Sequence, residues 1–138
     1  MIRILAIILV VLAIITIVVP QFTNCSADGR MLTLENVKQV AMKCTWTARA
    51  ELTTGIPLLV LGMLMAVWPR KDSTRVLSAL AAVFGVLTLL LPTSLIGVCM
   101  SADMDCNAIM KPTMIVVGIL TILVALTALV LNERKTAQ

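Results

Sequence analysis

Four long stretches without a single charged residue recur along this chain of 138 residues. They span residues 4–22, 52–68, 76–98 and 112–131, and each is close to the roughly 20 residues that a helix needs to cross a hydrocarbon core about 30 Å thick. They lack the alternation of apolar and polar residues that a membrane β-barrel requires. Charged residues make up 13% of the chain, against about a quarter in soluble domains. The sequence therefore predicts an all-α integral membrane protein, with a single domain built as a four-helix bundle.

The first apolar stretch has some features of a cleavable signal peptide. Arg3 precedes it, and the segment Cys25-Ser26-Ala27 that follows ends in a small residue. The apolar run is nevertheless longer than a usual signal core, and Phe22-Thr23-Asn24-Cys25 is a poor lipoprotein cleavage box. We therefore expect this stretch to be retained as the first membrane helix.

Four crossings return the chain to the side on which it began, so both termini and the connection of residues 69–75 share one face of the membrane. That connection holds three basic residues within seven positions, whereas residues 23–51 spread a similar number over about four times the length. Cytoplasmic loops are enriched in lysine and arginine. We therefore predict cytoplasmic termini and two extracytoplasmic loops, residues 23–51 and 99–111.

All four cysteines fall on one side of the membrane, whichever way the protein is oriented. Cys25 and Cys44 follow the first span, and Cys99 and Cys106 follow the third. Disulfides persist in oxidising compartments, and four cysteines allow three connectivities. The simplest joins Cys25 to Cys44 and Cys99 to Cys106 within their own loops, whereas the other two join the loops to each other. We expect these disulfides to staple a small extracytoplasmic cap.

The first outer loop contains a one-faced apolar pattern. Apolar residues recur at spacings of three and four and alternate with polar residues, which predicts a short amphipathic helix on the membrane surface or against the other outer loop. The apolar positions are Leu34, Val37, Val40, Ala41 and Cys44.

Two other uses of the cysteines stay open. Four spans with two outward cysteine pairs resemble, in layout only, the quinone-coupled oxidoreductases that reoxidise disulfide carriers, although this chain lacks their closely spaced Cys-x-x-Cys. Soft thioether and thiolate groups also select Cu(I), and the sequence contains no histidine, the usual ligand of zinc and Cu(II). The candidate Cu(I) ligands are Cys99, Met100, Met104 and Cys106. We expect the cysteines to form structural disulfides and the protein to bind no cofactor. Thiol–disulfide exchange and Cu(I) binding remain the two alternatives.

Two tryptophans bracket the second span. Trp46 and Trp68 are 22 residues apart, about 33 Å along a helix, which matches a pair of aromatic anchors at the two membrane interfaces. Arg49 and Glu51 then lie just below the outer interface. Residues two positions apart on a helix do not face each other, so each needs another partner. No span carries a charge at its middle, and we predict no catalytic residue.

Small residues allow helices to approach closely in lipid, where little hydrophobic force acts between them. Three pairs of small residues are spaced by four positions in the predicted spans, and either internal packing or a partner protein explains them. The pairs are Gly62 and Ala66, Ala81 and Gly85, and Thr121 and Ala125.

Two blocks are more distinctive than the hydropathy: residues 42–51, and residues 91–100 with Cys106-Asn107 and Lys111-Pro112 beyond them. Together they resemble a bacterial family of small four-span membrane proteins known only as a domain of unknown function, over nearly the whole chain. Members of that family often occur beside ABC transporters with permeases of the macrolide-exporter and cell-division type. The resemblance implies a non-enzymatic accessory or interaction subunit in the bacterial inner membrane. Its expected partners are the lipid bilayer and a transporter permease, with no nucleic acid.

Overall fold

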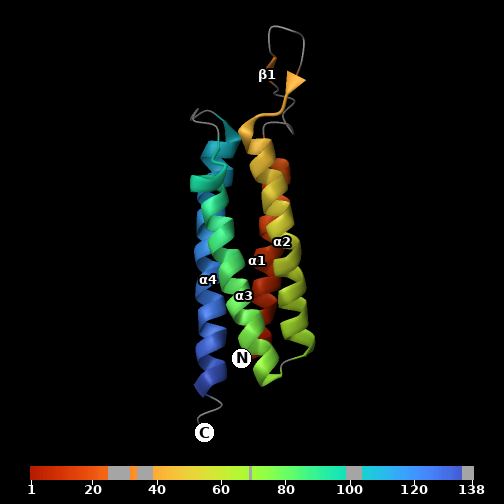
Figure 1. Cartoon of the computed structure of the whole chain (residues 1–138), viewed down its shortest axis with the longest axis vertical. Helices are drawn as coiled ribbons and strands as arrows, with labels where there is room; N and C mark the ends of the chain where they lie inside the picture. Colours follow the sequence, from red (N-terminus) through yellow and green to blue (C-terminus); the bar gives the residue numbers. More distant parts are fainter. Residues whose placement is uncertain (25–31, 34–38, 69, 99–103, 135–138) are drawn as a thin grey trace.

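Four long antiparallel helices form the body of the molecule (Figure 1). The computed structural model describes residues 1–24, 32–33, 39–68, 70–98 and 104–134. The helices run up and down in turn, so the start of α1 and the end of α4 lie at one end of the bundle and the strands lie at the other. The prediction of an all-helical bundle is confirmed for the described helices.

Each helix is long and apolar enough to cross a membrane. Two π-helical turns, η1 and η2, extend the third and fourth helices at the end of the bundle that carries the strands. The bounds are α1 Ile2–Phe22, α2 Lys43–Val67, α3 Lys71–Leu90, η1 Leu91–Leu95, η2 Cys106–Met110 and α4 Lys111–Arg134. The chain is therefore compatible with a multi-pass membrane protein.

The second helix is longer than its apolar stretch. α2 begins at Lys43, nine residues before the uncharged run that starts at Leu52. Alanine, lysine, arginine and glutamate favour helix, so the segment before Leu52 continues the helix although it carries charges. Glu51 therefore lies in the third turn of α2, within the bundle, rather than in a connecting loop.

Glycines bring α1 and α2 close together. A Cβ added at Gly62 would lie 2.9 Å from Cγ2 of Val10 and 3.2 Å from the Val10 backbone nitrogen. One added at Gly55 would lie 2.6 Å from Cγ1 of Ile17. Real Cβ atoms essentially never approach closer than 3.0 Å, so a larger residue at either position would make the side chain of Val10 or Ile17, or α1 itself, shift.

The contact between α3 and α4 is built in the same way. A Cβ added at Gly118 would lie 3.0 Å from Cβ of Leu89 and 3.1 Å from the carbonyl oxygen of Gly85, while one at Gly85 would lie 3.0 Å from Cγ1 of Ile122. Two glycines on facing helices thus allow the backbones themselves to meet, as is common between membrane helices.

The bundle consists of two tightly packed helix pairs, α1 with α2 and α3 with α4; the α1–α4 and α2–α3 contacts are less extensive. A core of small and aliphatic side chains from all four helices fills the centre, including Ala6, Leu58, Ala81 and Ala125. Small residues from each of the three pairs that the sequence singled out are buried inside the protein. Internal packing therefore accounts for them.

Two short strands lie beyond the bundle. β1, Leu32–Thr33, pairs antiparallel with β2, Gln39–Val40. Residues 34–38, on which most of the predicted amphipathic helix falls, lie outside the described residues. In the described part the prediction of a separate helix is wrong, because Val40 is paired in β2 and Cys44 belongs to α2. An isolated segment of about three turns is marginal as a helix in water, and strand pairing competes with it.

An ion pair joins α3 and α4 at the end opposite the strands. Arg75 Nη2 lies 3.3 Å from Glu133 Oε1, and both side chains are more than half exposed. Such a solvated pair contributes about 0–1 kcal/mol. It is a minor addition to the glycine contacts between the same two helices.

Candidate functional site

A cluster of sulfur-bearing side chains lies at the end of the bundle that carries the strands. Its four buried members all contain sulfur: Cys44, Cys106, Met110 and Met114. Cys44 comes from the first turn of α2, and the other three come from η2 and α4. By contrast, Met65 is the one sulfur-containing member among the buried residues of the central core. We call this group the sulfur cluster.

The spacing of three members explains why they meet. Cys106, Met110 and Met114 follow each other at intervals of four residues, so they form a stripe on one face of the continuous helix made by η2 and α4. Cys44 packs against this stripe from α2. Partly buried Met104 contacts the edge of the sulfur cluster, with Val19, Met42 and Val98.

Cys44 and Cys106 approach to within 4.0 Å of each other. That separation is about twice the S–S bond length of about 2.0 Å, so the structure brings the two cysteines near each other but does not support a disulfide between them. Cys25 and Cys99 lie outside the described residues, so the predicted set of disulfides stays a prediction. Of the suggested Cu(I) ligands, Cys99 and Met100 also lie outside the described residues, while Cys106 belongs to the sulfur cluster and Met104 to its edge.

Polar side chains connect the helices at the same end of the bundle, where the strands lie. Gln21 Nε2 donates to the carbonyl of Ala48 at 3.1 Å, which connects α1 to α2. Thr47 Oγ1 donates to the carbonyl of Gly97 at 2.7 Å, which connects α2 to the segment after η1. Gly97 has φ 78°, a left-handed conformation that residues with a Cβ adopt at a cost.

Replacement of Gly97 by alanine is expected to lower the free energy of unfolding by about 1–2 kcal/mol, because the backbone there is left-handed. The loss is conformational rather than steric, since among the described residues no atom beyond the two chain neighbours lies within 4 Å of a Cβ added at Gly97. Unfolding of the protein by denaturing detergent measures it. Ser94→Ala, at an exposed position of η1, is the control and should change stability little. Equal stability of the two variants would contradict the role given to Gly97.

A carboxyl group is buried between the helices, deeper in the bundle. The Glu51 side chain is 0% exposed, and Thr54 Oγ1 donates to its Oε2 at 3.3 Å. Three buried side-chain oxygens have no hydrogen-bond partner within the described residues: Thr45 Oγ1, Glu51 Oε1 and Thr88 Oγ1. The sequence placed Glu51 near the membrane boundary; the structure adds that it points into the protein.

The other residues predicted at the membrane boundary are exposed. Trp46 lies in the first turn of α2, and Trp68 directly follows its last residue. The Arg49 guanidinium lies 5.4 Å from the centre of the Trp46 ring, within the range of a cation–π contact. Arg49 and Glu51 thus have separate partners, as their spacing predicted. Whether the tryptophans mark the membrane interfaces stays a prediction.

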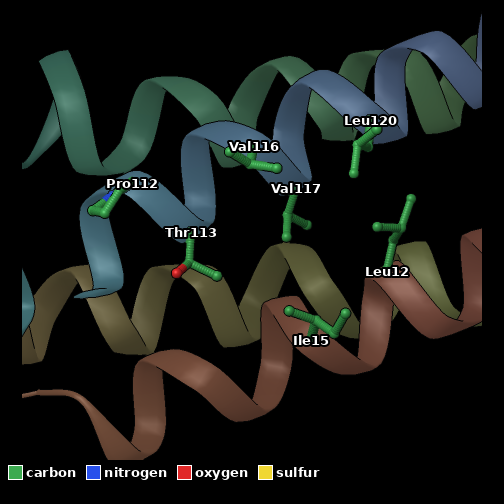
Figure 2. Close-up of a pocket in the computed structure, with 7 residues that line it drawn as sticks. All are labelled: Leu12, Ile15, Pro112, Thr113, Val116, Val117 and Leu120. Atoms are coloured by element: carbon green, nitrogen blue, oxygen red, sulfur yellow. The ribbon is translucent and has the colours of Figure 1, made fainter.

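An apolar groove runs along the outside of the bundle between α1 and α4, with a volume of about 410 Å³ (Figure 2). It lies where these helices pack less closely than α1 does with α2. Its lining residues are Leu12, Ile15, Pro112, Thr113, Val116, Val117 and Leu120. Thr113 supplies the one side-chain hydroxyl among them, and it donates to the carbonyl of Ile109. The groove therefore offers aliphatic surface and no charge.

No curated protein and no solved structure matches this sequence. The family described as a domain of unknown function, DUF4418, matches residues 4–131, which leaves out only the first three and the last seven residues. The match includes all four helices except the ends of α1 and α4. The chain therefore belongs to the DUF4418 family.

Proposed function

We propose that the protein is a non-enzymatic accessory subunit of a larger complex in the bacterial cytoplasmic membrane, such as an ABC transporter. In this proposal the termini are cytoplasmic and the sulfur cluster lies at the extracytoplasmic end. The density of basic residues in residues 69–75 supports that orientation. The partner is a permease whose transmembrane helix packs against the bundle.

The groove between α1 and α4 carries this proposal (Figure 2). Both helices have the length and hydropathy of membrane spans, so in a bilayer the groove opens sideways into the lipid layer. Membrane helices associate through van der Waals packing, and a groove accepts the bulky side chains of a neighbouring helix. None of its lining residues is charged, so it has no group to hold a lipid headgroup. An aliphatic helix surface fits this lining, and lipid acyl chains are the competing occupant.

Photo-cross-linking in native membranes tests the proposal. A photoreactive residue at Val116, in the groove, is expected to form an adduct with one membrane protein, identified by mass spectrometry as a transporter permease. Val83 on α3 is the matched control, since Val116 is 55% exposed and Val83 is 56% exposed. Adducts with lipid alone at Val116, or the same protein adducts at both positions, would rule out a specific partner in the groove.

The approach of Cys44 to Cys106 favours a second candidate function based on these two residues. A disulfide between them would join the two outer connections and hold the start of α2 against η2. Thiol–disulfide exchange would use the same bond but requires access for an attacking thiolate, whereas both side chains are buried. Cu(I) binding is the third use, and Met110 and Met114 extend the soft ligands available for it. Burial supports the structural staple among the three.

Mass spectrometry of the unreduced protein separates these uses. A staple is expected to give a Cys44–Cys106 cross-linked peptide whose amount does not change in glutathione redox buffers. Exchange chemistry predicts that the same peptide equilibrates with the buffer, and copper binding predicts retained metal with both thiols present. Recovery of a Cys25–Cys44 peptide would instead support pairing within the first outer loop.

A further inference from the structure

A pocket lies at the turn between α2 and α3, at the end of the bundle opposite the strands (Figure 1). Its volume is about 400 Å³, and its lining residues in the described part of the chain are Trp68, Arg70, Asp72 and Ser73. It shares no lining residue with the groove between α1 and α4. The role of an accessory subunit therefore leaves this pocket without a function.

The pocket brings together one positive and one negative side chain. Arg70 carries a guanidinium and Asp72 a carboxylate, so the charges of the described lining residues cancel. Neither group forms an ion pair with a side chain that the structure describes; the ion pair at this end of the bundle joins Arg75 to Glu133. Both Arg70 and Asp72 are exposed, so a ligand in the pocket can reach both charges.

The pocket lies at the ends of two helices that are long and apolar enough to cross a membrane. Trp68 directly follows α2 and is exposed, and tryptophan is enriched at the level of the lipid headgroups. Exposed apolar side chains continue along both helices: Leu64 is four residues before Trp68, and Val76 is four residues after Asp72. Residues four apart share a helix face, so the polar pocket passes into apolar surface, as a phospholipid headgroup passes into its acyl chains.

The two charges distinguish between lipid headgroups. Arginine suits a phosphate, because its guanidinium donates several hydrogen bonds to phosphate oxygens. The carboxylate of Asp72 attracts an ammonium group and repels a headgroup that carries negative charge alone. A primary ammonium also has N–H groups that donate to a carboxylate, whereas a quaternary ammonium has none. A headgroup with one phosphate and one primary amine therefore matches both side chains.

We propose that this pocket binds the headgroup of phosphatidylethanolamine, with Arg70 on the phosphate and Asp72 on the ammonium group. The hydroxyl of Ser73 supplies a further donor for the phosphate. The acyl chains lie along the exposed apolar side chains of α2 and α3. The site needs no partner protein, so it is tested separately from the accessory role.

Native mass spectrometry of the purified full chain in detergent tests the proposal. Phosphatidylethanolamine, phosphatidylglycerol and phosphatidylcholine with identical acyl chains are added at equal concentrations, and the bound lipid is identified by its mass. Phosphatidylethanolamine is expected to bind about fivefold more tightly than phosphatidylcholine, the upper range for an ion pair between exposed groups. Equal or tighter binding of phosphatidylcholine or of the anionic phosphatidylglycerol would overturn the proposal.

Two variants assign the contacts. Asp72→Asn should abolish the preference for phosphatidylethanolamine over phosphatidylcholine, whereas Glu133→Gln, at another exposed acid of the same end, should retain it. Arg70→Gln should weaken all three lipids by about fivefold, because each contains the phosphate. Arg134→Gln, at an exposed arginine of α4, is its control. A preference that survives Asp72→Asn, or wild-type affinity in Arg70→Gln, contradicts the assignment.

Soluble phosphoethanolamine separates a lipid site from a site for a small molecule. It has the same phosphate and amine but no acyl chains, and the chains supply most of the affinity of a lipid for apolar surface. An excess of phosphoethanolamine is expected to leave the lipid bound. Its displacement of the lipid would overturn the assignment of the pocket to a membrane phospholipid.

Discussion

Replacement of Gly118 by leucine is expected to cost about 3 kcal/mol or to prevent folding altogether, because overpacking at this position meets backbone atoms. An added Cβ already lies 3.0 Å from Cβ of Leu89 and 3.1 Å from the carbonyl oxygen of Gly85. The rest of a leucine side chain has no space unless α4 moves away from α3. Backbone atoms cannot yield as the end of a flexible side chain can.

Unfolding in denaturing detergent, together with size-exclusion chromatography, measures this effect. Ile119→Leu is the control, because Ile119 is the next residue on α4 and points outward. It should leave both the unfolding midpoint and the elution volume unchanged. If Gly118→Leu were as stable as the wild-type protein, the close approach of α3 and α4 would be wrong.

Glu51→Lys is expected to destabilise the protein by about 3–5 kcal/mol, because an uncompensated charge replaces a carboxyl group in the interior. The ammonium group of a lysine at this position would have no buried acid beside it among the described residues. The same chemical change at Glu133 provides the comparison. That side chain is 52% exposed, and its ion pair with Arg75 is worth about 0–1 kcal/mol.

Chemical unfolding of the Glu51→Lys and Glu133→Lys variants in the same detergent measures the free energy of unfolding of each. A difference of several kcal/mol is expected between them. If Glu51→Lys and Glu133→Lys were equally mild, Glu51 would have to lie at the surface, contrary to its burial between α2 and α3. The comparison therefore tests the buried position of Glu51.

Hydropathy alone predicts the four helices, because a helix that crosses a bilayer must be apolar over about 20 residues. The same criterion misplaces the start of α2. A hydropathy window averages over all faces of a helix. The charged residue Glu51 therefore makes the apolar stretch begin only at Leu52, although the Glu51 side chain points inward and the helix has already begun at Lys43. Which face a residue occupies depends on the neighbouring helices, and one span alone does not contain that information.

Only part of the sulfur cluster could be predicted from the sequence. The spacing of Cys106, Met110 and Met114 predicts a common face once these residues are known to be helical. The contact of Cys44 with that face depends on how the four helices assemble and so bring the start of α2 near η2, which no local pattern encodes. The pattern around Val40 shows a local prediction that was wrong: apolar spacings of three and four predicted a helix, but over so short a segment they do not exclude strand pairing.

The division of the bundle into two helix pairs also determines which relative movement of the helices requires the least free energy. Glycine contacts lock α1 to α2 and α3 to α4, whereas Glu51 and Thr88 face each other across the boundary between the pairs. Rocking of one rigid hairpin against the other, about the turn between α2 and α3, would leave every glycine contact intact. The same movement would hydrate Glu51, so its carboxyl would exchange with water only when the hairpins separate.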